Sequence, residues 1–427
     1  MLSISTARAR GRLRRALLAA TVATCSLPVA TNAATVDVTS DNTITYRAAS
    51  GETNSLLVRE LTGSRSLEIL DSAGLTSRSG LCASVNGTTV RCALGLERVD
   101  ARLGDGNDSA SIRVSGPAVV DGGGGQDLFF AGMAPGASRV DYRGGDRPDT
   151  VSYASASAGA VMKQDDVAND GRPSRGDRDT VRRDVEHFIG SPFDDTLEAS
   201  RTGLIRSFPG GDGATFPQRL TGGAGNDVVR GGRNLDVHFM GGGVDGRDTI
   251  IAGAGSSVVD YGGRGFGVAV TLQSGANDGA SGEGDDIQGS VEELIGGRGD
   301  DTLRALPGSN LSHSIVGGAG LDTLEGADGP DFLNGGDGED TLLGNDGDDS
   351  ISANDGFADV VGCGLGTDTA ELDSRDGFSS CETRRVGVLG LAPEALAGQT
   401  LQAGVEATDT RARRQLGADA ATLRVVE

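Results

Sequence analysis

Four consecutive nine-residue units place glycine, aspartate and an aliphatic residue at fixed positions. The units begin at Gly317, Gly326, Gly335 and Gly344. Each has glycine at positions 1 and 4, aspartate at position 6 and leucine or isoleucine at position 8. Glycine tolerates the left-handed backbone of sharp turns, and one aliphatic residue between small or polar ones suits a short half-buried strand. The spacing predicts a coil of two turns and two strands for every two units, with the position-8 residues stacked inward.

Turns two units apart would stack on the same side of this coil, which aligns their aspartates. Carboxylate and carbonyl oxygens are hard ligands that suit Ca²⁺. Without a cation the aligned carboxylates would repel each other, and the thin aliphatic core would not suffice for folding. We therefore expect several calcium ions. The expected ligand residues are Asp322, Asp328, Asp331, Asp337, Asp340, Asp346, Asp349, Asp359, Asp368, Gly317, Gly320, Gly326, Gly329, Gly335 and Gly338, joined by Asp108, Asp127, Asp227, Asp236 and Asp301 in scattered copies of the motif.

The scattered copies differ in how complete they are. The motifs that end at Asp227 and Asp301 are complete, whereas the one that ends at Asp149 lacks its second glycine. At Asp108, Asp127, Asp149 and Asp195 the sequence leaves two interpretations open: the carboxylates bind ions, or they stabilise their own turns by hydrogen bonding to nearby backbone.

These repeats resemble the secreted haemolysin-type (RTX) calcium-binding proteins, whose nonapeptide has the same pattern. The resemblance covers roughly residues 100–385 and is strongest at 296–370. It implies an all-β chain: a right-handed parallel β-roll or β-helix solenoid with Ca²⁺ between stacked turns. The chain departs from the haemolysin-type toxins and proteases in having an N-terminal signal and no recognisable effector domain, which argues against toxin or protease activity.

Composition agrees with an exported, cation-binding solenoid. Gly contributes 70 of 427 residues, aromatic residues are only 4% and Trp is absent, so a conventional core would be thin. The net charge of −23 disfavours nucleic acid and anionic membranes as partners. Outside the N-terminal segment no stretch is apolar for long enough to span a membrane. A cell-surface or matrix partner stays unidentified.

The two ends differ from the middle. Residues 1–33 have five arginines followed by a short apolar stretch, which predicts a signal peptide and a secreted protein. Residues 34–100 alternate apolar and polar side chains, which predicts a β-rich N-terminal cap. Asn86-Gly87 is expected to form the turn of a hairpin there. The tail, 386–427, has a weak helical pattern or is disordered.

Four cysteines lie beyond the signal segment, in two pairs that are close in sequence. Pairing of Cys82 with Cys92 and of Cys363 with Cys381 gives the shortest of the three possible connectivities and indicates an oxidising compartment. The first pair would close the cap hairpin, and the second would close the last coil of a solenoid over 101–385. A zinc site lacks the usual Cys-x-x-Cys spacing.

A longer repeat lies above the short one. Val151-Ser-Tyr153 recurs 108 residues later as Val259-Asp-Tyr261, and Asp195-Thr-Leu197 recurs 106 residues later as Asp301-Thr-Leu303. We expect two copies of one module, at about 141–227 and 249–322, ahead of the regular nonapeptides of 317–370.

Catalytic motifs are lacking. The three histidines lie in unrelated contexts, and neither His-Glu-x-x-His nor Gly-x-Ser-x-Gly occurs. Paired carboxylates for polysaccharide chemistry are the alternative, because β-helical enzymes exist and acids are plentiful here. We expect a structural or adhesive calcium-binding protein without enzymatic activity, and a β-helical enzyme acting on extracellular polysaccharide as the alternative.

Overall fold

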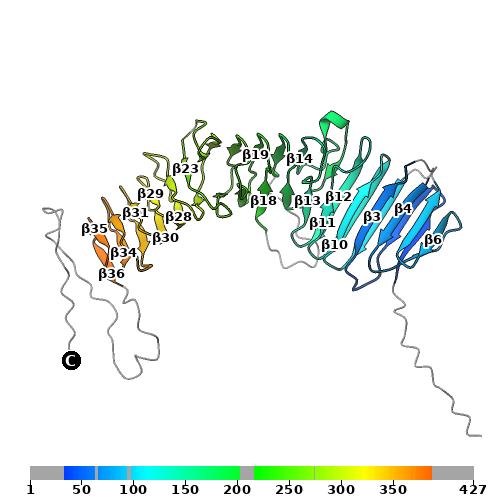
Figure 1. The fold of residues 1–427 in the computed structure, drawn as a ribbon, viewed down its shortest axis with the longest axis horizontal. Coiled ribbons are helices and arrows are strands. Elements are labelled where there is room, and N and C mark those ends of the chain that lie inside the picture. The colour runs from blue at the N-terminus through cyan, green and yellow to red at the C-terminus, as the bar shows by residue number, and fades with distance from the viewer. Residues whose placement is uncertain (1–32, 63–65, 94–97, 202–215, 274, 387–427) are drawn as a thin grey trace, which may run out of the picture. The chain divides into compact units, whose positions relative to one another are not determined.

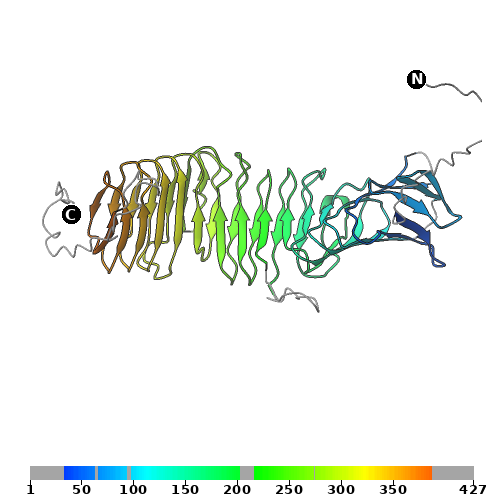
Figure 2. The ribbon, with the colours of Figure 1, turned by 90° about the horizontal axis from the view of Figure 1, so that it is seen from below.

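The computed structural model describes residues 33–62, 66–93, 98–201, 216–273 and 275–386. Nearly all regular structure in this part of the chain is β, and the exception is the 3-10 helix η1 (Pro173–Arg175). The strands alternate between two faces, and those on one face stack as parallel rungs (Figure 1, Figure 2). The expected all-β parallel roll is therefore confirmed.

One face is a single long sheet. Its strands, in order of pairing, are β6 (Cys82–Asn86), β7 (Thr89–Ala93), β4 (Ser66–Asp71), β3 (Ser55–Glu60), β9 (Ser109–Arg113), β11 (Leu128–Phe130), β13 (Thr150–Ser152), β16 (His187–Ile189), β18 (Gln218–Thr221), β20 (Asp236–Phe239), β22 (Ser257–Asp260), β26 (Glu293–Ile295), β28 (Ser314–Ala319), β30 (Phe332–Asp337), β32 (Ser350–Ala353), β34 (Thr369–Leu372) and β36 (Thr383–Val386). From the β3–β9 pair to the β34–β36 pair at the end of this sheet, neighbouring strands are parallel.

The opposite face consists of three shorter sheets. The first contains β5 (Leu75–Ser77), β1 (Ala34–Val38), β2 (Thr43–Arg47), β8 (Arg98–Gly104), β10 (Pro117–Gly124), β12 (Arg139–Asp146) and β15 (Thr180–Val181). The second contains β14 (Val161–Lys163), β17 (Thr196–Glu198), β19 (Val228–Arg230), β21 (Thr249–Ile251) and β25 (Asp286–Gln288). The third contains β24 (Gly279–Ala280), β23 (Val268–Thr271), β27 (Thr302–Arg304), β29 (Thr323–Glu325), β31 (Thr341–Leu343), β33 (Val360–Gly362) and β35 (Gly377–Ser379).

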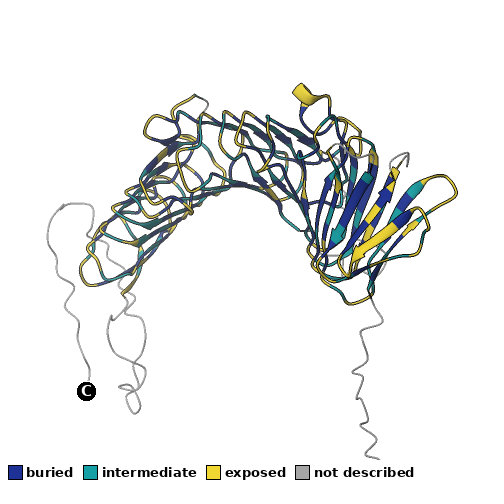
Figure 3. Cartoon of the chain, turned by 45° about the vertical axis from the view of Figure 1, so that its right-hand side comes forward, coloured by how far each residue is buried: buried dark blue, intermediate teal, exposed yellow. Residues whose placement is uncertain are grey.

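The core of the repeats is one inward column of side chains on each face. On the short strands only the middle residue points inward, so Leu324, Leu342 and Val361 stack in register on one face. Leu333 and Ile351 stack likewise on the other face. These side chains are buried, while the residues on either side of them are partly exposed, as the alternating colours along the strands show (Figure 3). The period-2 pattern of the sequence produces this arrangement.

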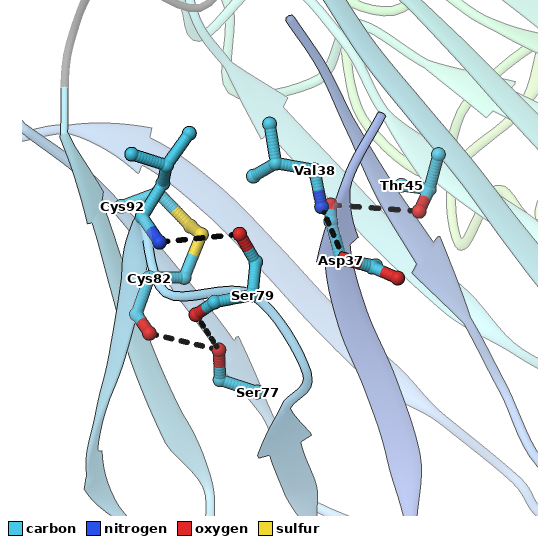
Figure 4. Close-up of a disulfide and its surroundings, with 8 residues drawn as sticks. Asp37, Val38, Thr45, Ser77, Ser79, Cys82 and Cys92 are labelled. Atoms are coloured by element: carbon cyan, nitrogen blue, oxygen red, sulfur yellow. Dashed lines mark hydrogen bonds between the residues drawn. A yellow bond between two sulfur atoms is a disulfide. The ribbon is translucent and has the colours of Figure 1, made fainter. Parts of the chain in front are cut away.

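The N-terminal strands form a thicker, partly antiparallel structure. β3 pairs with β4, and β6 pairs with β7, in antiparallel fashion. The predicted Cys82–Cys92 disulfide joins β6 to β7, and the Ser77 hydroxyl donates to the carbonyl of Cys82 beside it (Figure 4). The expected turn is displaced by one residue: Asn86 still pairs with Thr89, so Gly87 and Thr88 form the loop. The Asn86 side chain stabilises this loop by accepting from the Thr88 N–H at 2.9 Å.

The two long modules are the places where one short sheet ends and the next begins. In the first, β14 starts the second sheet before β15 completes the first sheet. In the second, β23 starts the third sheet before β25 completes the second. The connecting loops have matching antiparallel contacts, Val161 with Gly171 and Ala269 with Gly279. The sequence repeat therefore corresponds to a repeated change of sheet.

The expected signal peptide, apart from Ala33, and the tail after Val386 lie outside the described residues. Within the described part of the chain, no helix has the length and apolar character needed to cross a membrane.

Candidate functional site

The position-6 aspartates form hydrogen-bonded ladders along the roll. In each ladder one carboxylate oxygen, Oδ1, accepts the backbone N–H of the aspartate one coil earlier. Asp340 accepts from Asp322 and Asp359 accepts from Asp340, both at 2.8 Å. On the other side Asp349 accepts from Asp331 at 2.8 Å and Asp368 from Asp349 at 2.9 Å. These hydrogen bonds form only when turns two units apart stack on each other, as the sequence predicts.

The second carboxylate oxygen, Oδ2, of these residues is buried and has no hydrogen-bond partner in Asp322, Asp340, Asp349, Asp359 and Asp368. Each of these residues is at most 2% exposed. A buried oxygen without a donor carries a desolvation cost that a bound cation would offset.

The first glycine of each unit makes room for this oxygen. A Cβ on Gly335 would lie 2.3 Å from Oδ2 of Asp340, and one on Gly317 would lie 2.4 Å from Oδ2 of Asp322. A side chain at position 1 of these two turns would therefore displace the carboxylate. This steric requirement explains the first glycine of the motif without reference to turn flexibility.

Backbone conformation at positions 2 and 4 separates two kinds of turn among the complete repeats. In the turns that end at Asp322 and Asp340, positions 2 and 4 have positive φ, as in Gly336 (105°) and Gly338 (148°). The turn that ends at Asp349 does the same with the non-glycine Asn345 (74°) and Gly347 (127°). We call such turns open, because the N–H of position 2 makes no hydrogen bond to the carboxylate.

Other turns are closed. In the turns that end at Asp301 and Asp331, positions 2 and 4 are not left-handed, and Oδ2 accepts the N–H of position 2 at 2.6 Å. Asp236 is held in the same way by Gly232, which leaves only its Oδ1 without a partner. Three of the expected ligands thus have at least one oxygen committed to their own turn. Asp195, for which the sequence left two interpretations, also bonds its own turn through Ser191.

The remaining expected ligands fall into three groups. Asp328, Asp337 and Asp346, at position 3, are exposed on the outside of the turns and are not part of the ladders. Asp108, Asp127 and Asp227 are buried with a free Oδ2. The glycines Gly317, Gly320, Gly326, Gly329, Gly335 and Gly338 line the turns, and a Cβ on any of them would lie within 2.6 Å of a carboxylate or backbone atom.

The last coil is closed by the predicted Cys363–Cys381 disulfide. The position of Cys363 within its nine-residue unit follows from the stacking of the turns, although the preceding Gly362 in the sequence suggests that Cys363 replaces the second glycine. Asp368 stacks on Asp349, and left-handed Gly364 lies over Asn345, so Cys363 occupies position 1.

The charged side chains around the C-terminal ladders are acidic. Residues 305–374 contain fifteen Asp and Glu and no Lys or Arg. Burial raises the pKa of Asp322 and of Asp359 to about 7, and that of Asp349 to about 6. Neighbouring ladder carboxylates raise these pKa values further. No cationic side chain forms an ion pair with these aspartates in the described part of the chain.

The donor set fits a hard divalent cation. Each open turn offers one carboxylate oxygen next to main-chain carbonyl groups, the ligand types that Ca²⁺ prefers. Within the described ranges no three Asp, Glu, His or Cys side chains converge on one point. Main-chain oxygens from the turns would therefore complete the coordination.

Two groups of residues were missed at the sequence level. Position 5 carries a second ladder that runs in the opposite direction, since Asp348 accepts from the Thr367 N–H and Asp300 from the Leu321 N–H. In the modules, buried Arg172 and Arg264 bind acidic side chains. Comparison of the two module copies could have revealed the arginines, because each aligns with an alanine in the other copy.

The sequence model of the RTX calcium-binding nonapeptide repeat matches four copies in this chain, within residues 211–237, 289–311 and 315–356. No curated protein matches the chain. The match confirms the resemblance drawn from the motif, and it includes the turns that end at Asp227, Asp301, Asp322, Asp331, Asp340 and Asp349.

Proposed function

Because the chain carries RTX calcium-binding nonapeptide repeats, we propose that it is an extracellular protein that folds as it binds several calcium ions and serves a structural or adhesive role. The single observation that carries this proposal is the stack of buried, unpartnered Oδ2 atoms in a segment without Lys or Arg. Because this segment has no Lys or Arg, a cation that neutralises its carboxylates has to come from solution.

The extracellular assignment has two supports. Two disulfides close the N-terminal hairpin and the last coil, and such bonds persist in oxidising compartments. Extracellular calcium-binding modules typically have dissociation constants of about 10⁻⁴–10⁻³ M, far above the cytosolic calcium concentration. A chain with sites in this range would remain unfolded inside the cell and fold after export.

The non-catalytic role is favoured over the polysaccharide enzyme. A cavity of about 650 Å³ lies beside the loop of the second module, and its lining contains no aromatic side chain to stack on a sugar ring. Its acids have structural partners: Asp278 accepts the N–H of Thr271, and Glu283 binds Arg264. This lining supports the structural proposal.

A calcium titration of the chelator-treated protein, followed by far-ultraviolet circular dichroism, tests the proposal. Calcium should produce a cooperative gain of β signal, and the same concentrations of magnesium should not. A spectrum that is already fully β in chelator, and does not change with calcium, would contradict calcium-coupled folding.

A further inference from the structure

Three turns near the N-terminus leave a carboxylate oxygen free as the C-terminal open turns do, although they lie outside the stretches that match the repeat family. They end at Asp108, Asp127 and Asp149, which are at most 2% exposed. The turns that end at Asp127 and Asp149 are open, with positive φ at positions 2 and 4, whereas the turn that ends at Asp108 is left-handed at position 2 and not at position 4. In all three residues Oδ2 is buried and has no hydrogen-bond partner. These oxygens are the same unsatisfied group that marks the C-terminal sites.

The three turns stack directly on one another. Oδ1 of Asp127 accepts the N–H of Asp108 at 2.9 Å, and Oδ1 of Asp149 accepts the N–H of Asp127 at 2.7 Å. The strands that lead into them are paired in register, with Gly123 between Gly104 and Gly145. This ladder therefore has as many consecutive free oxygens as the one formed by Asp322, Asp340 and Asp359.

Backbone strain supports the same conclusion. The turn that ends at Asp149 has Gly145 at φ 117° and, at position 4, Arg147 at φ 80°. Left-handed conformations are uncommon for residues other than glycine and are retained where the surrounding structure requires them. Asn345 shows that the C-terminal repeats also use a non-glycine residue to build an open turn.

The charges around the ladder are acidic. Burial raises the pKa values of Asp127 and Asp149, and the nearby carboxylates of Asp121, Asp184 and Glu186 raise them further. None of the three ladder carboxylates forms an ion pair with a cationic side chain in the described ranges. Arg102 and Arg143 act on Asp121 instead.

We propose that the turns that end at Asp108, Asp127 and Asp149 form a second calcium-binding ladder, and that the complete motif that ends at Asp301 binds no ion through its carboxylate. The inference rests on the proposed function for the identity of the cation. Completeness of the motif would rank the two sites in the opposite order, because the Asp149 motif lacks a glycine that the Asp301 motif has.

Tyrosine-sensitised terbium luminescence can locate this ladder, with Tb³⁺ as a probe for Ca²⁺ in the full chain. The Tyr46 hydroxyl donates to Asn54, whose side chain donates to Asp108, while residues 262–427 contain no Tyr. Tyr142 lies near the ladder as well, because its ring centroid is 5.8 Å from that of Phe129, two residues after Asp127. We expect strong emission on excitation of tyrosine. Asp127→Asn with Asp149→Asn should remove both the emission and bound ions.

Two variants serve as controls. Asp301→Asn should bind as many calcium ions as the wild type, measured by equilibrium dialysis. Asp340→Asn should lose an ion and keep the emission, which separates this proposal from the proposed function. The asparagine retains the Oδ1 acceptor of the ladder, and circular dichroism in calcium checks that each variant folds. Emission that survives in the Asp127/Asp149 variant, or an ion lost in Asp301→Asn, would overturn the proposal while the C-terminal sites stand.

Discussion

The modules and the regular repeats both bury carboxylates, and they differ in what neutralises them. In the modules the cation belongs to the chain. Arg172 binds Asp177 with its Nε 2.7 Å from the carboxylate, and both side chains are at most 2% exposed. Burial alone would raise the pKa of Asp177, but the hydrogen bonds from Arg172 hold it below its ordinary value. In the repeats the pKa of Asp322 is instead raised to about 7.

The second module provides the same guanidinium from another place. Glu283 occupies the position of Asp177 and binds Arg264, which also binds Asp245 at 2.7 Å. Arg264 aligns with Ala156 of the first module, and Arg172 aligns with Ala280 of the second. The two copies thus keep one buried cation while they exchange the residue that supplies it. The regular repeats of 305–374 contain no Lys or Arg that could play this part.

The largest effect should follow from removing the cation of a module. Arg172→Met leaves Asp177 buried without its partner, which should cost about 3–5 kcal/mol of unfolding free energy. Because calcium is not involved, the loss should be similar in calcium and in chelator. Denaturant unfolding in both conditions measures it. A loss below about 1 kcal/mol would mean that Asp177 does not need the guanidinium.

The exchange between modules gives a rescue experiment. Ala156→Arg, added to Arg172→Met, places an arginine where the second module has Arg264. It should restore about 1 kcal/mol or more by supplying charged hydrogen bonds to Asp177. A double variant no more stable than the single one would show that the two positions are not equivalent.

The pH dependence should have opposite signs with and without calcium. The pKa values of Asp322 and Asp359 are about 7 in the fold, against about 3.9 for an unfolded aspartate. The folded state binds these protons more tightly, so their stabilising contribution is complete below about pH 4 and is lost as pH rises through about 7. In chelator the folding equilibrium of the repeats should therefore shift toward the unfolded state by about 2 kcal/mol from pH 6.5 to pH 8.

In saturating calcium the trend should reverse, because protons compete with the ion for the same oxygens. The range stays above pH 6.5 because burial lowers the pKa values of His187 and His238 to about 4, which favours unfolding at lower pH. Thermal unfolding at the two pH values in calcium, and the β signal in circular dichroism at the same pH values in chelator, test this prediction. The same sign in both conditions would argue against free carboxylates in the repeats.

The smallest expected effect is on the stability of one variant, which should rise in chelator and fall in calcium. Asp340→Asn keeps the Oδ1 acceptor and removes a buried charge, so in chelator it should stabilise the fold by about 1 kcal/mol. In calcium it should destabilise the fold, because a ligand is lost. Asp337→Asn, which changes the exposed position-3 aspartate of the same turn, should be neutral in both conditions. Equal effects of the two variants would mean that the ladder is not the binding element.

The spacing of residues in the sequence predicted the stacking of the turns and the pairing of the cysteines. Asp322 and Asp340 had to stack once their turns were placed two units apart, and the disulfides joined the nearest cysteines. The state of each turn could not be predicted in this way. A Cβ on Gly336 would lie 1.9 Å from the carbonyl of Gly318, so the conformation of one turn depends on the turn beneath it. The motif is therefore complete at Asp301 although that turn is closed.

The module arginines were hidden for a related reason. The partners of Arg172 include the carbonyl oxygens of Ala134 and Gly136, 38 and 36 residues away. Such contacts form only after the loop folds back on the preceding coil. Periodicity locates the loop, and the three-dimensional contacts alone show which residue in it carries the buried charge.

Hydrogen–deuterium exchange of the full chain, followed by mass spectrometry in excess calcium and in chelator, tests the central claim most directly. Peptides from 305–374, which contain no Lys or Arg, should be protected in calcium and lose that protection in chelator. Peptides that contain the Arg172–Asp177 pair should keep more of theirs, because the cation there is part of the chain. Equal protection of 305–374 in both conditions would contradict the claim that calcium supplies the missing cation of the repeats.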